Sequence, residues 1–334
     1  MLRIAIVGSG FGLYGHLPAF NSIRNCKVIA ICGKKTERLV NYCESIDLKK
    51  IYIDWQEMLK KEKLDAIAIA VNPSSQYKIA KKAIEKGINV FAEKPLAVNV
   101  PQAKELLELA KKNKIIHAVD FIFPEIDLWQ KAKQLIDDKA IGELKHISVN
   151  WDFLSFDIKN KVSSWKTNVR EGGGSLSYYF SHTLYYLEYF VGEILDIKSI
   201  FSYSKDSING GETGIDLLTR FKNEVRGCVH LHCDFRGLNR HQLIFQCERG
   251  TIILENENAI TEGFIIKIYN ENGVEKLLSK NVIMKKDEDE RVRIIKKIAA
   301  RFVDACIYNK QFVPSFREGV RVQELMEKIR AEQM

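Results

Sequence analysis

Apolar runs and amphipathic stretches alternate regularly through the first third of the chain. Nearly uninterrupted apolar or β-branched residues predict strands at residues 2–7, 27–32, 51–53, 65–71, 88–92 and 115–120. The stretches between them predict helices at residues 14–24, from Thr36 onwards, and at 55–61, 76–86 and 101–113. Strands that are apolar along their whole length are buried on both faces. These repeated strand–helix units therefore predict an α/β domain with a parallel sheet between two layers of helices.

The pattern changes after about residue 120. Helices are expected at residues 126–137, from Gly172-Gly173-Gly174 to about 190, at 290–307, and from Ser315 to the C-terminus. Alternating positions predict strands at residues 144–153, 194–204, 217–221, 225–235, 243–247, 251–255 and 264–269. This order is typical of an α+β domain whose antiparallel sheet has helices on one face. We therefore predict two domains, residues 1–120 and residues 121–334.

Composition narrows the class of protein. The 334 residues are 46% hydrophobic and 28% charged, which is the balance of a chain that buries a core. The net charge of +8 is dispersed in lysine doublets, which favours a solvated surface over a nucleic-acid partner. The first residues predict a strand and not a leader, and no apolar run approaches the roughly 20 residues of a membrane span. The seven cysteines form no C-x-x-C pair and predict reduced thiols in a cytoplasmic protein, with neither disulfides nor a zinc site.

A glycine-rich turn follows the first predicted strand and opens a helix. It reads Gly8-Ser9-Gly10-Phe11-Gly12, so the third glycine of G-x-G-x-x-G would fall at Leu13, beside Gly12. Glycines at this point let the backbone turn sharply and approach a pyrophosphate that sits on the amides of the helix N-terminus. We predict a dinucleotide-binding turn formed by Gly8, Gly10, Phe11 and Gly12. The alternative is a tight turn without a ligand.

The end of the second strand bears on which dinucleotide binds. A site that prefers NAD(H) places Asp or Glu there to hold the ribose 2′-hydroxyl. This chain reads Gly33-Lys34-Lys35-Thr36, with no carboxylate before Glu37. Two cations and a hydroxyl suit a 2′-phosphate, so NADP(H) is favoured and NAD(H) is the second possibility. The alternative is that Lys34 and Lys35 are simply exposed before a helix.

A Glu93-Lys94-Pro95 triplet ends a central strand, where open α/β sheets place their ligands. Asn72-Pro73 ends the preceding strand, and further matching segments run almost the whole length: Asp65-Ala66-Ile67-Ala68-Ile69, Ile141-Gly142-Glu143-Leu144, Trp165 before Gly172-Gly173-Gly174, and Pro314-Ser315-Phe316-Arg317-Glu318-Gly319. With these motifs the chain resembles the glucose-fructose oxidoreductase/inositol dehydrogenase/MocA (Gfo/Idh/MocA) family. This set of motifs is specific for the family and its two-domain fold. It is much less specific for any one substrate.

The resemblance implies an N-terminal Rossmann domain that binds NAD(P) and a C-terminal domain with a large open sheet. In relatives that sheet commonly forms the oligomer interface, so a homodimer or homotetramer is expected. The resemblance also implies that Asn72, Pro73 and Glu93 line the cofactor site and that Lys94 lies near the nicotinamide and the reacting hydroxyl. An ammonium there orients a sugar hydroxyl and stabilises the developing alkoxide. A cis peptide before Pro95, as in relatives, would fix the direction of the lysine.

The helix after the glycine run carries the second catalytic candidate, His182. Relatives read approximately Asp-x-Gly-x-His here; this chain keeps the histidine but has Tyr178 at the aspartate position, and Tyr185 where a second acidic residue is common. At about 100° per residue, Tyr178, His182, Tyr185 and Tyr189 form one stripe, opposite a face of Leu176, Phe180, Leu184, Leu187 and Val191. Such a stripe suits a sugar-binding cleft, with His182 as acid/base and Tyr178 orienting the imidazole. The alternative is that it packs on the second-domain sheet.

Other side chains are weaker candidates. Trp165, Lys166, Arg170 and Tyr185 are expected substrate contacts, with exposed loop residues as the alternative. His230 and His232 alternate on a strand and point to one face. No metal-ligand spacing surrounds them, so we expect a hydrogen-bonded pair and no metal. His16 either lines the cofactor pocket or caps local backbone.

Together these features predict an NADP(H)-preferring oxidoreductase that acts on a sugar, a sugar derivative or another polyol. Hydride moves between a carbinol carbon and the nicotinamide, while Lys94 and His182, from different domains, act on the oxygen and its proton. The alternative is a catalytically inactive dinucleotide-binding sensor, which the loss of both acidic residues near His182 favours. A scaffold that binds no cofactor would require the glycine turn and the Glu93-Lys94-Pro95 triplet to be coincidental.

Overall fold

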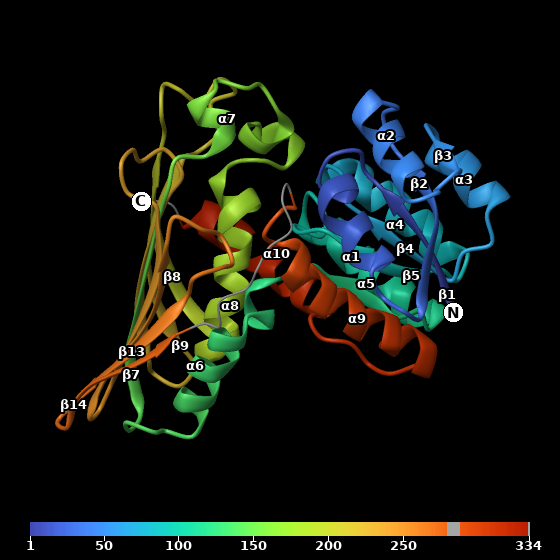
Figure 1. The fold of residues 1–334 in the computed structure, drawn as a ribbon. Helices are drawn as coiled ribbons and strands as arrows, with labels where there is room; N and C mark the ends of the chain where they lie inside the picture. Colours follow the sequence, from blue (N-terminus) through green and yellow to red (C-terminus); the bar gives the residue numbers. More distant parts are fainter. Residues whose placement is uncertain (279–287, 333–334) are drawn as a thin grey trace. The chain divides into compact units, whose positions relative to one another are not determined.

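The computed structural model describes residues 1–278 and 288–332 and divides into two compact units (Figure 1). The first unit holds residues 1–122 and 288–323, and the second holds residues 123–278 and 324–332. The predicted division after residue 120 thus lies within two residues of the first change of unit. The prediction of one continuous second domain, residues 121–334, differs from the structure, because the chain returns to the first unit before it ends.

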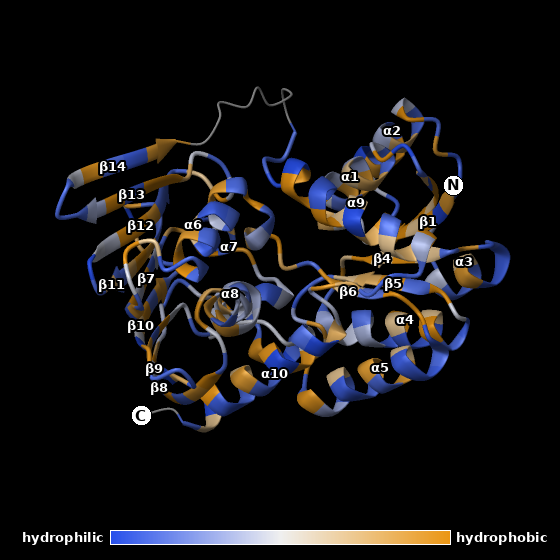
Figure 2. Cartoon of the chain, turned by 90° about the horizontal axis from the view of Figure 1, so that it is seen from below, coloured by the Kyte–Doolittle hydropathy of each residue, from blue (hydrophilic) through white to orange (hydrophobic). Residues whose placement is uncertain are grey.

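The first unit is built on a six-stranded parallel sheet in the order β3-β2-β1-β4-β5-β6. Its strands are β1 (Leu2–Val7), β2 (Cys26–Cys32), β3 (Ile51–Tyr52), β4 (Ala66–Ile69), β5 (Asn89–Ala92) and β6 (His117–Val119). All four residues of β4 are buried, as expected of a strand covered on both faces. Figure 2 shows β4 in the colour of hydrophobic residues and hydrophilic stretches on the helices α4 and α5. This strand order is that of a doubly wound, dinucleotide-binding sheet and confirms the α/β prediction.

Several helices of this unit begin at a side chain that caps their first turn. They are the π-helical turn η1 (Gly12–His16), α1 (Leu17–Asn21), α2 (Glu37–Ser45), α3 (Trp55–Lys61), α4 (Pro73–Glu85), α5 (Val100–Asn113), α9 (Val292–Tyr308) and the first part of α10 (Phe316–Ala331). The side chains of Thr36, Asp54, Asn72 and Asn99 each accept a hydrogen bond from a backbone amide of the first turn. Proline follows Asn72 immediately and Asn99 after one residue, where its missing N–H costs nothing.

Helix α9 explains why the second domain is not continuous. Its residues Ile298, Phe302 and Val303 are fully buried in the core of the first unit. The ring of Phe302 lies 5.4 Å from that of Phe91 and 6.5 Å from that of Phe20, both edge-on. The amphipathic pattern predicts this helix, but an apolar face alone does not tell which sheet it covers.

The second unit contains an eight-stranded sheet in the order β14-β13-β12-β11-β7-β10-β9-β8. Its strands are β7 (Leu144–Asp152), β8 (Ile194–Ser202), β9 (Gly214–Phe221), β10 (Arg226–His232), β11 (Arg240–Cys247), β12 (Gly250–Glu257), β13 (Ile265–Asn270) and β14 (Gly273–Leu278). Strands β7 and β10 pair in parallel, whereas the other pairings of the sheet are antiparallel. The open antiparallel sheet was predicted, but β14 was missed because most of its residues are exposed and carry no alternating pattern.

One face of this sheet is covered by helices α6 (Asp127–Asp137) and α8 (Ser181–Val191), as Figure 1 shows. The inward residues of the strands, such as Val149, Leu231 and Leu243, are buried, and Trp129 of α6 is fully buried above them. The smaller elements of the unit are η2 (Phe123–Glu125), α7 (Phe156–Lys159), η3 (Trp165–Thr167), η4 (Val169–Glu171) and the π-helical turn η5 (Leu176–Phe180). The predicted single helix from the glycine run to residue 190 is therefore η5 followed by α8.

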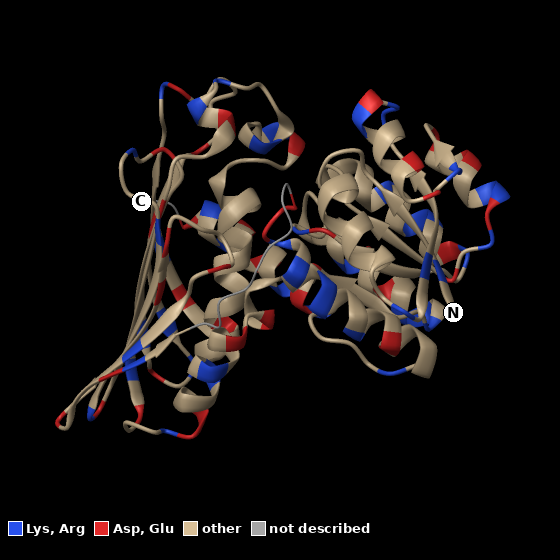
Figure 3. Cartoon of the chain, viewed as in Figure 1, with Lys and Arg blue, Asp and Glu red and all other residues tan. Residues whose placement is uncertain are grey.

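Charged residues are interspersed along both units, with Asp and Glu among the Lys and Arg (Figure 3). Among residues 1–278 and 288–332, every helix is too short or too polar to traverse a lipid bilayer. The predicted closing helix is α10, which ends at Ala331; the last two residues of the chain, to which that prediction extended, lie outside the described part.

Candidate active site

The glycine turn brings three strand ends of the first unit together. Gly8 has a φ of +129°, and a Cβ added there would lie 2.2 Å from the carbonyl oxygen of Ala70, which follows β4. A Cβ at Gly33, which follows β2, would lie 2.9 Å from the backbone nitrogen of Ser9. At Gly12 the corresponding Cβ would be 3.2 Å from the carbonyl oxygen of Val7, whereas Gly10 faces open space. Only glycine fits at positions 8 and 33, because any side chain there would collide with the neighbouring backbone. The turn therefore has the tight geometry that a pyrophosphate site needs.

Phe11 is held by a cluster of rings and one cation. Its ring lies edge-on to Tyr14 at 5.4 Å and to His16 at 5.5 Å, and Arg291 places its guanidinium carbon 4.3 Å from the ring centroid. A second guanidinium, that of Arg38, lies 5.5 Å from the ring of Tyr14. Both arginines were missed by the sequence analysis. Arg291 is distant in sequence, and Arg38 lies two residues beyond the segment from Gly33 to Thr36.

The segment after β2 is open to solvent. Lys34, Lys35 and Thr36 are exposed and Gly33 is half-buried. The hydroxyl of Thr36 accepts a hydrogen bond from the amide of Leu39 at 3.3 Å, so it caps α2 as predicted. The two ammonium groups therefore stand at the carboxyl end of β2, close in sequence to the glycine Gly33 that packs on the turn.

A buried glutamine holds the Glu93-Lys94-Pro95 turn. The side-chain amide of Gln76 donates to the carbonyl oxygens of Glu93, Pro95 and Leu96 at 2.6, 3.0 and 3.1 Å. Its carbonyl oxygen accepts from the amide of Glu93 at 3.0 Å. The peptide between Lys94 and Pro95 is cis, as the resemblance implies. Gln76 fixes the backbone around half-buried Lys94, a role that no spacing in the sequence reveals.

Asn72 and Pro73 start the helix that carries Gln76. The side chain of Asn72 accepts from the amide of Ser75 at 2.9 Å, and Pro73 occupies the first position of α4. These two predicted cofactor residues lie at the carboxyl edge of β4, next to the edge of β5 that bears Glu93. The structure thus brings the predicted turn, Asn72, Glu93 and Lys94 to one edge of the parallel sheet.

Beneath this edge, His16 joins two carboxyl groups. Its Nε2 lies 3.1 Å from Oε1 of Glu93 and 3.1 Å from Oδ2 of Asp120, which follows β6. Burial alone lowers the pKa of this histidine, but the hydrogen bonds and charges of Asp120 and Glu93 outweigh burial and raise it to about 9. Burial raises the pKa of both carboxyls; His16 more than reverses this at Glu93, whose pKa is lowered, whereas at Asp120 burial prevails and the pKa rises to about 6.

The sequence left two alternatives for His16, a place in the cofactor pocket or a cap on local backbone, and the cluster shows a third arrangement. The imidazole is fully buried and bonds to side chains, so it neither lies open in a pocket nor caps the backbone. Asp120 was missed because a carboxylate at the end of a short strand has no motif of its own. A protonated His16 balances buried negative charge directly behind the backbone of Lys94, whose amide donates to Oε2 of Glu93 at 3.2 Å.

In the second unit, His182 stands on the first turn of α8. Its side chain is buried, and its ring lies edge-on to Phe123 at 5.2 Å. The predicted two-faced helix is confirmed, since Tyr178, Tyr185 and Tyr189 are half-buried and the aliphatic positions opposite are buried. Because Tyr178 lies in the π-helical turn η5, its angle to His182 differs from that of a regular α-helix.

Three of the predicted substrate and catalytic residues do lie together. The ring of Trp165 is 5.6 Å from that of Tyr178, edge-on, and Nζ of Lys166 is 5.0 Å from the centroid of the same Tyr178 ring. Arg170 is exposed in the next turn, η4, and Tyr185 is half-buried on α8. The cation and the two rings form an amphipathic surface of the kind that sugars contact.

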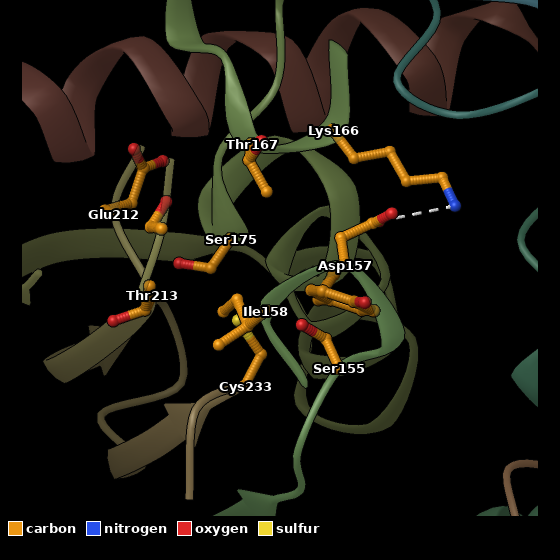
Figure 4. Close-up of a pocket in the computed structure, with 11 residues that line it drawn as sticks. Ser155, Asp157, Ile158, Lys166, Thr167, Ser175, Glu212, Thr213 and Cys233 are labelled. Carbon is orange, nitrogen blue, oxygen red and sulfur yellow. Dashed lines mark ion pairs between the residues drawn. The ribbon is translucent and has the colours of Figure 1, made fainter. Parts of the chain in front are cut away.

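A small polar hollow lies beside this cluster (Figure 4). It is lined by Lys166 and by buried hydroxyls such as those of Ser175 and Thr213, and Lys166 approaches Asp157 there at 3.6 Å. Its volume of about 10 Å³ matches what one water molecule needs. The hollow is therefore too small to hold a sugar.

Sequence reasoning also missed a buried polar pair in the second unit. The hydroxyl of Tyr186 lies 3.1 Å from Nε2 of His241, whose ring stacks on Trp151 at 4.3 Å. Burial lowers the pKa of His241 to about 3. This histidine is a neutral member of the aromatic core and not an acid/base candidate.

Comparison with known proteins identifies the family. Residues 2–121 match the family described as "Oxidoreductase family, NAD-binding Rossmann fold". Residues 129–253 match the one described as "GFO/IDH/MocA C-terminal domain". The chain belongs to the Gfo/Idh/MocA oxidoreductase family. This Gfo/Idh/MocA protein thus has the Rossmann domain that the glycine turn and the strand order indicate, and the resemblance seen in its motifs is confirmed.

Two relatives of the Gfo/Idh/MocA protein match much of its length at low identity. An uncharacterized oxidoreductase of Synechocystis sp. is 26% identical over 98% of this chain and 92% of its own length. The D-apiose dehydrogenase of Paraburkholderia graminis is 23% identical, with 80% of this chain and 70% of that protein covered.

Solved structures share the fold over nearly the whole chain. Levoglucosan dehydrogenase in complex with NADH and L-sorbose superposes with a TM-score of 0.86 at 18% identity, covering 99% of this chain and 96% of that one. A 3-ketoreductase from Actinomadura kijaniata in complex with NADP and TDP-benzene gives 0.82 at 17% identity, covering 99% and 98%. One of these proteins was crystallised with NADH and the other with NADP.

Proposed function

We propose that this Gfo/Idh/MocA protein transfers hydride between NADP(H) and a carbinol or carbonyl carbon of a sugar, sugar derivative or polyol. The observation that carries the proposal is the carboxyl edge of the parallel sheet. There the backbone approach at Gly8 and the Gln76 clamp around Lys94 are built by residues far apart in sequence. The names of relatives, a D-apiose dehydrogenase and a levoglucosan dehydrogenase among them, support a sugar-like substrate.

The turn at Gly8 fits a dinucleotide-binding turn. A Cβ at Gly8 would collide with the carbonyl oxygen of Ala70, so only glycine allows the backbone to turn this tightly after β1. When bound, the nicotinamide supplies the acceptor or donor of hydride. The ammonium group of Lys94 orients the substrate hydroxyl and stabilises the negative charge that develops on its oxygen. The cis Lys94–Pro95 peptide and the Gln76 bonds define the backbone from which that side chain extends.

His182 is proposed as the acid/base that takes or returns the hydroxyl proton, with Tyr178 as a neighbour that orients it. Trp165 and Lys166, which contact Tyr178, and Tyr185 and Arg170 are proposed substrate contacts. Rings pack on the apolar faces of a sugar while the ammonium group and hydroxyls bond its oxygens. These roles rest on the family resemblance and on the amphipathic cluster around Tyr178.

NADP(H) is the proposed cofactor over NAD(H). Lys34 and Lys35 are exposed at the carboxyl end of β2, where they can reach a ribose 2′-phosphate, and no carboxylate precedes Glu37. The related structures hold either cofactor, so the preference rests on the charges of this chain.

A second candidate function is a dinucleotide-binding sensor without turnover. The observation that favours it is the pair Tyr178 and Tyr185, which occupy positions that are acidic in many relatives. One experiment separates the two functions. NADP⁺ reduction and NADPH oxidation are followed across a panel of sugars, polyols and keto-sugars, with fluorescence titration of NADPH and NADH alongside. Turnover of any compound supports the enzyme, whereas tight NADPH binding without turnover supports the sensor.

The same proposal includes a cytoplasmic homo-oligomer that assembles through the open face of the eight-stranded sheet. Exposed apolar side chains occupy outward positions at the two ends of the sheet: Ile200 and Leu218 on β8 and β9, and Tyr269, Val274 and Leu278 on β13 and β14. Exposed apolar patches on an open sheet face favour association with another chain. Light scattering of the purified protein should give a dimer or tetramer mass, and Leu218→Glu should lower it. A monomer mass for the unaltered protein would remove this part of the proposal.

A further inference from the structure

Two histidines and an aspartate face each other on the open side of the second unit's sheet. His230 and His232 alternate along β10, and their rings stack with centroids 4.3 Å apart at an angle of 18°. Asp216 lies opposite His230 on β9. Its Oδ1 is 2.6 Å from Nδ1 of His230, and its Oδ2 is 3.4 Å from Nε2 of His232. One donor atom from each of the three side chains lies within 4.8 Å of the others.

The remaining nitrogen of each histidine faces a further carboxylate. Nε2 of His230 is 3.1 Å from Oδ1 of Asp152, and Nδ1 of His232 is 3.7 Å from Oδ1 of Asp234. Histidines that bind metals usually direct their second nitrogen at a carboxylate, which fixes the ring and strengthens the ligand. The two carboxylates are themselves held, Asp152 by Arg240 at 2.6 Å and Asp234 by the hydroxyl of Thr213 at 3.0 Å.

The carboxylates around the two histidines carry more negative charge than the nearby guanidinium group balances. The Oδ1 atoms of Asp152 and Asp234 are buried and face histidine nitrogens at 3.1 and 3.7 Å, with no further hydrogen bond in the described part of the chain. The side chain of Asp152 is only 4% exposed. With neutral imidazoles, the three carboxylates outnumber the single guanidinium of Arg240 by two charges. A divalent cation balances that excess.

A glycine makes room for the second ring. Gly214 pairs with His232 across the β9–β10 ladder, and a Cβ there would lie 2.3 Å from Cε1 and Nδ1 of the imidazole. The imidazole of His232 therefore lies over the backbone of the neighbouring strand, where its Nε2 faces Asp216. A side chain at this position would displace the ring and leave all donor groups present.

We propose that Asp216, His230 and His232 bind a divalent transition metal of the zinc type, tying β9 to β10 on the open face. Two imidazoles and a carboxylate suit zinc, nickel or iron, and poorly suit magnesium, which prefers all-oxygen sites. The sequence showed one pair of histidines without a ligand spacing, because Asp216 becomes adjacent only through the strand ladder. The site is separate from the residues proposed for hydride transfer, so the inference does not depend on the proposed function.

The experiment titrates chelator-treated, desalted full-length protein with ZnCl₂ by calorimetry, with MgCl₂ as the comparison ion. We expect one high-affinity zinc ion per chain and no such event with magnesium. His230→Gln and Asp216→Asn should each weaken zinc binding about tenfold or more, and Gly214→Ala should do so while keeping every ligand. His146→Gln, which removes a histidine from the adjacent strand β7, is the matched control and should bind zinc as the unaltered protein does.

Circular dichroism of each variant in chelator checks that it folds, and the half-buried positions Asp216 and His230 are less able to disturb folding than the buried His232. Equal zinc binding by the unaltered protein and the His230→Gln variant would overturn the proposal. So would absence of a zinc event in the unaltered protein. Loss of binding in His146→Gln equal to that in His230→Gln would overturn it as well.

Discussion

Nε2 of His16 lies 3.1 Å from Oδ2 of Asp120, although 104 residues separate the two in the sequence. His16 ends the turn η1, and Asp120 follows β6, the strand two places beyond β4 in the sheet. Glu93, between them, completes a buried charge cluster behind the backbone of Lys94. The first unit therefore links its dinucleotide turn to its proposed catalytic lysine through ionisable groups.

This cluster predicts alkaline destabilisation. The pKa of His16 is about 9 in the folded protein and about 6.5 when unfolded, so its contribution is fully present below pH 6.5 and is lost as pH rises through 9. The free energy of unfolding should fall by on the order of 3 kcal/mol over that window. The raised pKa of Asp120 acts at lower pH, between about 4 and 6, with the same sign. Urea unfolding at a series of pH values measures both.

His16→Gln supplies the control for that measurement. Glutamine keeps a hydrogen-bond donor but carries no charge, so Glu93 and Asp120 are left facing each other in a buried site. We expect lower stability at pH 6.5 and a flatter profile between pH 6.5 and 9. An unaltered protein whose stability is already constant over this window would contradict the assigned charge state.

The two glycines of the phosphate-binding turn should respond very differently to alanine. Gly8→Ala places a Cβ 2.2 Å from a backbone oxygen at a φ of +129°, so it should destabilise the protein by more than about 3 kcal/mol. Gly10→Ala meets no atom within 4 Å and should leave the free energy of unfolding almost unchanged. Thermal or urea unfolding compares them, and similar losses in both variants would show that the turn has another geometry.

Lys94→Ala should lower kcat by about 10²–10³, the usual effect of removing one group that stabilises a developing oxyanion. NADPH affinity should change little, because the backbone clamp from Gln76 stays in place. Lys49→Ala, which removes an exposed lysine of the same unit, is the control for loss of charge. His182→Gln is tested in the same assay, and full turnover in either variant would remove that side chain from the proposed mechanism.

Cofactor preference depends on the charges after β2. Replacing Lys34 and Lys35 together by glutamate should raise KM for NADPH about tenfold or more, since the 2′-phosphate loses two cations and gains repulsion. KM for NADH should change much less. If both constants move equally, the lysines do not contact the 2′-phosphate, and Arg38, which lies against Tyr14 of the turn, becomes the next residue to test.

The first unit was predictable because its signals are local. Apolar strands, the cap at Thr36 and the prolines after Asn72 and Asn99 each act within a few residues, and the observed elements follow them closely. The strand β14 was missed because its exposed residues carry no local pattern. Helix α9 was predicted as a helix but assigned to the wrong unit, because its buried face does not encode a partner.

The sequence by itself determined the family, the parallel sheet of the α/β domain and the two-faced helix of His182, because motifs and periodicity depend on neighbouring residues. Only the tertiary structure decided which distant side chains share a site. Sheet pairing and packing bring three sets of side chains together: Gln76 with the backbone around Lys94, Asp120 with His16, and Asp216 with His230 and His232. A polar side chain acquires its partner, and with it its charge and chemistry, only when the backbone brings that partner within hydrogen-bond distance.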